Sequence, residues 1–165
     1  MNRRDFMKVA AASVLAASSD KVSAKVFDET TFATPANKKT KGIIVRFLGT
    51  GAADWNGPDN RGEHRRLSSI LVDGHILVDF TPTDVEMLPK GCTPDTIFYT
   101  HSHGDHYHPA TALKVGVKRV YLGQTWYNVA VLDFQRAAKE LNLPMPEIIP
   151  LYVGESVTID SLKFT

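Results

Sequence analysis

Short apolar runs, bounded by glycine, proline and acidic residues, recur along the chain after residue 42. Runs of this length, rich in β-branched and aromatic residues, are typical of strands. Asp73-Gly74 separates two of these runs and predicts a tight hairpin, with His75 exposed beside the turn. Residues 157–164 alternate apolar and polar side chains, which predicts a second hairpin at the end of the sequence. The other strands are expected at residues 43–48, 69–72, 75–80, 97–99, 117–122 and 148–153.

Helical periodicity is clearest between residues 124 and 142. Apolar residues recur there at steps of three or four and form a stripe that we expect to pack into the core. The stripe consists of Trp126, Ala130, Phe134, Ala137 and Leu141. A short helix is expected at 82–88, where Pro89-Lys90-Gly91 would stop it. Another is expected from Pro109, because proline suits the first turn of a helix.

The first 41 residues have a different pattern from the rest. A basic start is followed by a short apolar run over 9–17 and by small residues at 22–24, as in an export signal. Residues 3–8 resemble the twin-arginine signal, which implies export to the periplasm or cell envelope. We therefore interpret 1–24 as a signal peptide and 25–41 as a polar linker, the alternative for the start being an amphipathic or frayed N-terminal helix.

Composition bounds the class of protein. The 165 residues, 43% of them hydrophobic and 22% charged, are typical of one soluble globular domain. The net charge of +1 conceals an asymmetry, because residues 1–41 hold eight of the 19 basic and four of the 18 acidic residues. The remaining 124 residues are therefore acidic by three charges, which argues against a nucleic-acid binder. Cys92, the single cysteine, excludes an internal disulfide and is either a small buried residue or a partly exposed thiol.

The strongest chemical signal is the stretch from Thr100 to His106, with the pattern H-x-H-x-D-H. Imidazole and carboxylate suit zinc, iron or manganese. Residues two apart in extended chain point the same way, so His101 and His103 are expected to converge on one ion. Gly104 would permit a reversal through positive φ, after which Asp105 and His106 would face a second ion. The alternative is a histidine-rich polar loop that binds no metal.

Two other features are candidate site residues. Arg65-Arg66 would recognise a substrate phosphate or carboxylate through the planar guanidinium, unless these side chains are simply solvated. The loop at 54–63 is rich in glycine, proline, asparagine and aspartate, and Trp55 within it would either touch a substrate or serve packing.

The motif after the apolar strand 97–99 resembles that of the metallo-β-lactamase superfamily. The segment 47–51, Phe-Leu-Gly-Thr-Gly, resembles the opening of the branch that holds tRNA 3′-processing endonucleases and small phosphodiesterases. The resemblance implies an αββα sandwich of the mixed α/β (α+β) class over residues 42–165. It also implies a hydrolase that uses a metal-bound hydroxide on a small-molecule substrate, with a weak preference for phosphodiesters. Two divalent ions, zinc in the first place, would be held by His101, His103, Asp105 and His106.

Within this resemblance two residues acquire roles beyond ligation. Asp105 would also orient the hydroxide. Asp79, at the end of an expected strand, would lie beneath the metal loop and accept a hydrogen bond from a ligand histidine. The alternative for Asp79 is a helix N-cap or a turn.

The resemblance covers about the first half of the superfamily's sandwich. The superfamily draws further ligands, two histidines and an aspartate, from well downstream, and no histidine follows His108 here. We therefore expect a partial form of a longer enzyme, completed by its missing C-terminal half or by a partner, with an uncovered sheet face, an exposed apolar surface and low stability alone. The alternatives are a reduced single-metal site completed by His64 or His108, and a non-catalytic metal-binding half-domain.

Overall fold

A computed structural model of the chain describes residues 42–51 and 66–165. The expected signal peptide (1–24), linker (25–41) and loop (54–63, with Trp55) lie outside the described residues, as do His64 and Arg65. In the part that is described, no helix is both long and apolar enough to cross a membrane.

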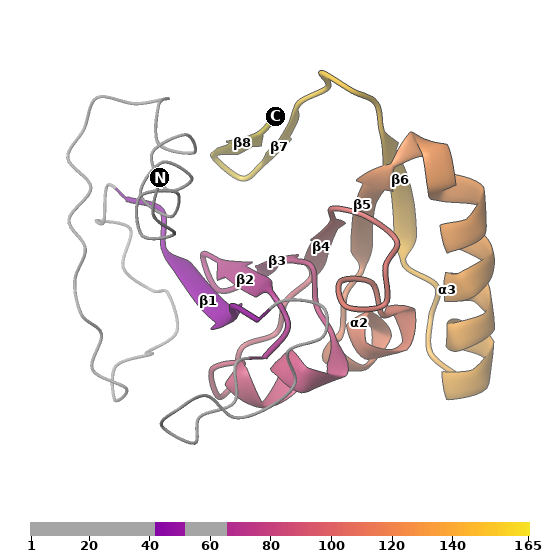
Figure 1. The fold of residues 1–165 in the computed structure, drawn as a ribbon, viewed down its shortest axis with the longest axis horizontal. Helices are drawn as coiled ribbons and strands as arrows, with labels where there is room; N and C mark the ends of the chain where they lie inside the picture. The colour runs from indigo at the N-terminus through magenta and orange to yellow at the C-terminus, as the bar shows by residue number, and fades with distance from the viewer. Residues whose placement is uncertain (1–41, 52–65) are drawn as a thin grey trace, which may run out of the picture. The chain divides into compact units, whose positions relative to one another are not determined.

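Six of the eight described strands form one sheet with the spatial order β1-β2-β3-β4-β5-β6 (Figure 1). The strands are β1 (Val45–Gly49), β2 (Ser69–Val72), β3 (Ile76–Val78), β4 (Thr96–Tyr99), β5 (Arg119–Gly123) and β6 (Glu147–Leu151). The first three strands pair antiparallel, and β3 to β6 pair parallel. The predicted hairpin joins β2 to β3 through three residues, 73–75, between the paired Val72 and Ile76, and Asp73 and Gly74 take the positive φ values of 47° and 79° that such tight turns use.

Helical segments connect the parallel strands, since a parallel pair needs a crossover. They are the 3₁₀ helix η1 (Pro82–Met87), α2 (Pro109–Val115), the 3₁₀ turn η2 (Gln124–Trp126) and α3 (Tyr127–Leu141). Proline occupies the first turn of both η1 and α2, as the sequence predicts. The predicted stripe of α3 faces the core, where Ala130 and Phe134 are fully buried.

Alternation along the strands divides the core into two layers. Leu77, Ile97 and Val120 point to the face covered by α2 and α3. Their neighbours in sequence, among them Phe98 and Tyr121, point to the other face, where the hairpin of β7 (Val157–Ile159) and β8 (Leu162–Phe164) packs (Figure 1). The predicted mixed α/β class is therefore confirmed.

An aromatic stack joins the hairpin to the sheet. The Phe98 ring lies between Phe164 and Tyr121, with centroids 4.5 Å and 4.7 Å away. At the β1 edge of the same face, Val45 and Phe47 pair with Val72 and Ile70 but are 45% and 67% exposed. The apolar surface of this face thus continues beyond the side chains that the hairpin contacts.

Two local predictions about this part of the chain are wrong. The third strand ends at Val78 rather than at residue 80, because Asp79 takes a left-handed backbone conformation with φ 51°. His75 is partly buried rather than exposed, because its Nε2 atom lies 2.9 Å from Asp160 Oδ2 in the turn between β7 and β8.

Candidate metal centre

The candidate site lies where the neighbouring parallel strands β3 and β4 end. Val78 pairs with Phe98, and the next residue of β3's chain, Asp79, donates its backbone N–H to the Phe98 carbonyl at 2.8 Å. Parallel strands bring their carboxyl ends to one edge of a sheet, which is where polar loop residues from both strands meet. Asp79 and Thr100 are therefore neighbours although 21 residues separate them in sequence.

A tight turn shapes the loop after β4. The His103 carbonyl accepts the N–H groups of His106 and Tyr107, at 3.0 Å and 2.8 Å. The Phe80 N–H donates to the His106 carbonyl at 3.1 Å, which ties the loop to the chain after β3. The prediction that Gly104 supplies a positive φ is wrong, because the positive-φ glycines among the described residues do not include it.

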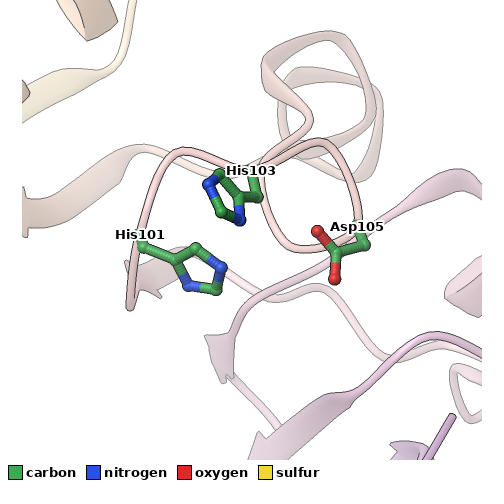
Figure 2. A group of neighbouring side chains, drawn as sticks. All are labelled: His101, His103 and Asp105. Carbon is green, nitrogen blue, oxygen red and sulfur yellow. The ribbon is translucent and has the colours of Figure 1, made fainter. Parts of the chain in front are cut away.

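Three of the predicted ligands form one group. The nitrogen or oxygen ligand atoms of His101, His103 and Asp105 all lie within 4.8 Å of one another. Figure 2 shows the three side chains turned toward one another, from two limbs of the same loop. His101 and Asp105 are partly buried, whereas His103 is exposed, so the group is open to solvent on one side.

His106 lies directly beside this group. Its Nε2 atom is 3.1 Å from Asp105 Oδ2, and its ring centroid is 4.2 Å from that of His101. The predicted division into a His101–His103 pair and an Asp105–His106 pair is thus not the grouping that the side chains show. Asp105 joins both, in contact with His106 and within the group formed with the two other histidines.

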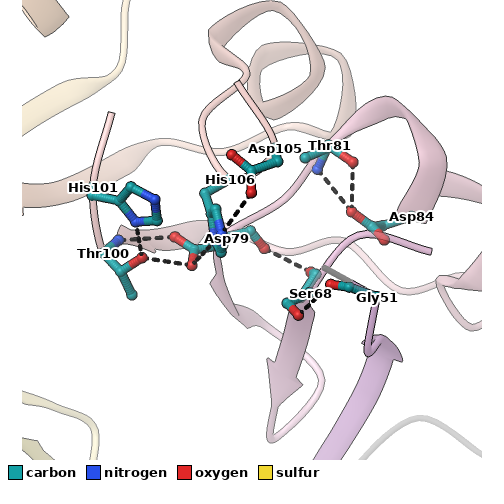
Figure 3. Close-up of polar contacts among 10 residues, drawn as sticks. Gly51, Ser68, Asp79, Thr81, Asp84, Thr100, His101, Asp105 and His106 are labelled. Carbon is teal, nitrogen blue, oxygen red and sulfur yellow. Dashed lines mark hydrogen bonds and ion pairs between the residues drawn. The ribbon is translucent and has the colours of Figure 1, made fainter. Parts of the chain in front are cut away.

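Asp79 is the buried anchor beneath the loop (Figure 3). Its Oδ2 atom lies 2.8 Å from His106 Nδ1 and accepts the Thr100 hydroxyl at 2.8 Å, while Oδ1 accepts the Thr100 N–H at 2.8 Å. Its carbonyl accepts the hydroxyl of buried Ser69 at 2.6 Å. The N-cap of η1 is Thr81, so the helix-cap alternative for Asp79 is not what the structure shows.

These contacts give the site donors that suit a divalent cation. A carboxylate only accepts hydrogen bonds, so the His106 Nδ1 atom must carry the proton that it shares with Asp79. The Nε2 atom of the same ring lies 3.1 Å from Asp105 Oδ2, and with a cation in the group its lone pair would be available as a ligand. An imidazole with its far nitrogen hydrogen-bonded to a carboxylate is the usual state of a metal-bound histidine. The residues present therefore fit a zinc, manganese or iron ion.

The other described histidines have structural contacts. His108 is the N-cap of α2, where its Nδ1 accepts the Thr111 N–H at 3.3 Å. Burial, with a further contribution from Lys114, lowers the pKa of His108, which keeps the ring neutral in this role. His75 lies beside Asp160, directly before β3, at the end of that strand that is opposite to the candidate site.

The remaining predicted residue that the structure describes is Arg66. Its guanidinium forms an ion pair with Glu86 in η1. This ion pair does not test whether Arg66 binds a substrate. Substrate binding therefore stays a prediction for Arg65 and Arg66.

The sequence interpretation missed the roles of Thr100 and Ser69. Both hydroxyls bind Asp79, one at its side chain and one at its carbonyl. For Thr100 the sequence offered one signal, its position directly before the first histidine of the motif. The contact of Ser69 has no sequence signal, because it depends on the pairing of β2 with β3.

Among known proteins, no family model matches this chain, and a search of curated proteins finds no significant match.

Proposed function

We propose that this chain is a metal-dependent hydrolase of the metallo-β-lactamase superfamily, with residues 101–106 as its metal loop. The observation that carries the proposal is the convergence of His101, His103 and Asp105, whose ligand atoms lie within 4.8 Å of one another. Random polar loops seldom bring two imidazoles and a carboxylate together at the end of a buried strand. Asp79 behind His106 adds the outer partner that such sites generally have.

The layer arrangement supports the same proposal. Helices cover one face of a mixed sheet and a β-hairpin packs on the other, and this helix–sheet–strand order is compatible with part of an αββα sandwich. The proposed site lies at the carboxyl ends of parallel strands, the usual place for a site in a sheet of this kind. The assignment of this sheet to the metallo-β-lactamase fold is part of the proposal.

The chain's own residues would divide the work as follows. His101, His103 and Asp105 would hold the ion, and His106 would complete its surroundings or take part in holding a second ion. Asp79 would keep the proton on His106 Nδ1 and leave Nε2 available. A divalent ion in this site would supply Lewis acidity, which activates water and polarises a carbonyl or phosphoryl oxygen. Asp105, 3.1 Å from His106 Nε2 and with its ligand atom within 4.8 Å of those of His101 and His103, would orient the attacking water.

The proposal includes a substrate class. A small phosphodiester is our first choice, because of the opening segment 47–51 and the arginines at 65–66. Lactone, thioester and β-lactam substrates would need the same loop, since specificity lies in other parts of such sites.

The test uses the full chain with zinc or manganese and an activated aryl phosphodiester. Wild-type protein is expected to bind the metal, by dialysis and elemental analysis, and to hydrolyse the ester. His103→Ala is expected to lose most bound metal and to reduce hydrolysis to the metal-free background. His75→Ala is the matched control, since this histidine lies beside Asp160 and not at the site. Equal activity of His103→Ala and wild type would contradict the proposal.

The alternative is a non-catalytic metal-binding half-domain that a partner completes. It is favoured by the small number of ligands that the described residues bring together, one group of three with His106 beside it. Metal bound at the loop and lost in His103→Ala, without hydrolysis of a phosphodiester, lactone, thioester or β-lactam, would support this alternative.

A further inference from the structure

Thr100 lies between the buried carboxylate and the first histidine of the loop. Its backbone N–H and its hydroxyl both donate to Asp79, to Oδ1 and Oδ2, each at 2.8 Å. The same hydroxyl oxygen lies 2.9 Å from His101 Nδ1. Figure 3 shows this chain of contacts from Asp79 through Thr100 to His101, alongside the direct contact of Asp79 with His106.

The donors in this chain can be assigned from chemistry alone. A hydroxyl has one hydrogen, and a carboxylate can only accept, so the Thr100 hydrogen is directed to Asp79. Toward His101 the Thr100 oxygen must therefore accept, and the proton must be on His101 Nδ1. The lone pair of the neutral His101 ring is then on Nε2. Without such a contact, a neutral histidine in water prefers the opposite tautomer, with the proton on Nε2.

We propose that Thr100 is a positioning residue whose hydroxyl relays Asp79 to His101, so that the buried carboxylate sets the tautomer of this candidate ligand. Asp79 contacts His106 directly and His101 through Thr100. This inference rests on the proposed metal site for its purpose, but its physical content is a property of the metal-free chain. It gives a role to the hydroxyl of the residue that precedes the first histidine.

Substitution at Thr100 separates the hydroxyl from the backbone contact. Thr100→Val keeps the shape and the backbone N–H to Asp79 but removes the hydroxyl. Thr100→Ser keeps the hydroxyl and is the matched conservative variant. Asp79→Asn is the third variant, because asparagine tolerates the positive φ of 51° at this position.

The primary measurement is the tautomer of His101 in the metal-free, ¹⁵N-labelled full chain, by long-range ¹H–¹⁵N correlation at a pH where this ring is neutral. Wild type and Thr100→Ser are expected to show the His101 proton on Nδ1, and a proton on His106 Nδ1, the nitrogen that faces Asp79. Thr100→Val is expected to move His101 toward the Nε2-protonated form and to leave His106 unchanged, which makes His106 an internal control. Asp79→Asn is expected to change the distribution of protons over the two ring nitrogens in both His101 and His106.

The second measurement is zinc affinity by competition with a chelating dye. Thr100→Val is expected to bind zinc roughly 10- to 100-fold more weakly than wild type, the usual range for loss of an outer partner. Thr100→Ser is expected to bind as wild type does. A His101 ring with its proton on Nε2 in wild type, or one whose tautomer is the same in Thr100→Val, would overturn the relay.

Failure of the relay and failure of the proposed function give different results. If the tautomers respond as expected but the chain hydrolyses nothing, the relay stands and the hydrolase proposal fails. If the chain hydrolyses a substrate with metal while the His101 tautomer ignores Thr100, the hydrolase proposal stands and the relay fails.

Discussion

At the scale of single residues, Asp79 combines an unusual backbone conformation with contacts to the candidate metal loop. It is buried and has a φ of 51°, a conformation that L-residues other than glycine, asparagine and aspartate rarely adopt. The contacts from Ser69, Phe98, Thr100 and His106 hold it there. Because of this φ, the backbone leaves the direction of β3 at Asp79. The Asp79 carboxylate then contacts the loop that follows β4. Strained residues persist where their surroundings over-determine them, and such places are often functional.

Two glycines, Gly104 in the metal loop and Gly49 at the end of β1, differ in the space around them, which gives a residue-scale prediction. A Cβ on Gly104 would have no atom within 4 Å, and its φ is not positive, so Gly104→Ala fits the folded state. We expect this variant to keep or raise the free energy of unfolding, by up to about 1 kcal/mol, because alanine reduces the entropy of the unfolded chain.

Gly49→Ala is the contrasting variant. A Cβ there would overlap the Leu67 carbonyl oxygen and lie 2.7 Å from that of Arg66, where β1 passes the chain before β2. We expect a loss of about 1–3 kcal/mol or more, as for overpacking in a core. Urea unfolding of both full-length variants measures the difference. A larger loss for Gly104→Ala than for Gly49→Ala would show that the loop needs glycine for a reason other than space or φ.

At the scale of elements, η1 depends on a buried carboxylate at its start. Asp84 Oδ2 accepts the Thr81 N–H at 2.9 Å and the Thr81 hydroxyl at 2.8 Å, while the side chain is fully buried. Burial raises the pKa of Asp84 above its ordinary value of 3.8, although the Thr81 contacts act in the opposite direction. The cap therefore stabilises the turn at a cost in desolvation.

The raised pKa of Asp84 predicts a pH dependence of stability with a definite sign. Between the ordinary value of 3.8 and the raised value, the unfolded chain has released this proton and the folded chain still holds it. The free energy of unfolding contributed by Asp84 therefore falls as pH rises through that window and is constant above it.

Asp84→Asn tests this dependence, because it keeps an oxygen acceptor and cannot ionise. Urea unfolding of wild type and variant over the acid range should show the difference between them growing with pH in favour of Asp84→Asn. Asp84→Ala, without an acceptor, is expected to be less stable than Asp84→Asn at every pH, by about 1 kcal/mol. If wild type gained stability relative to Asp84→Asn as pH rises, the predicted direction of this pH dependence would be contradicted.

At the scale of the folded unit of residues 43–165, the two faces of the sheet are covered unequally. Helices α2 and α3 bury one face, whereas the hairpin of β7 and β8 covers the other around Phe98 and Tyr121. Val45 and Phe47 stay exposed on the hairpin's side of the sheet. Contiguous exposed apolar surface of this kind promotes association between molecules.

This surface gives a prediction for the full chain. Phe47→Ser should lower self-association and dye binding to apolar surface, because Phe47 is 67% exposed. Its free energy of unfolding should change by no more than about 0.5 kcal/mol, as for most surface substitutions. Sedimentation velocity and urea unfolding measure the two quantities. The control is Leu132→Ser, on the outer side of α3, where a side chain 61% exposed lies away from this face. An equal effect of both variants on self-association would show that the β1 edge has no special role in it.

The sequence by itself determined the features that arise locally. Alternating and continuous apolar runs located every described strand, Asp73-Gly74 predicted the β2–β3 turn, and the α3 stripe predicted its buried side, since these depend on neighbouring side chains and backbone preferences. The same is true of the position of the histidine motif directly after a buried strand.

Only the tertiary structure decided how distant residues meet. The parallel pairing of β3 with β4 brings Asp79 to His106, 27 residues away, and to Thr100. The shape of the loop places Asp105 with both histidines and leaves Gly104 with an ordinary φ, and the hairpin brings Asp160 to His75. No sequence pattern carries these contacts, because each is set by the register and packing of strands that are far apart along the chain.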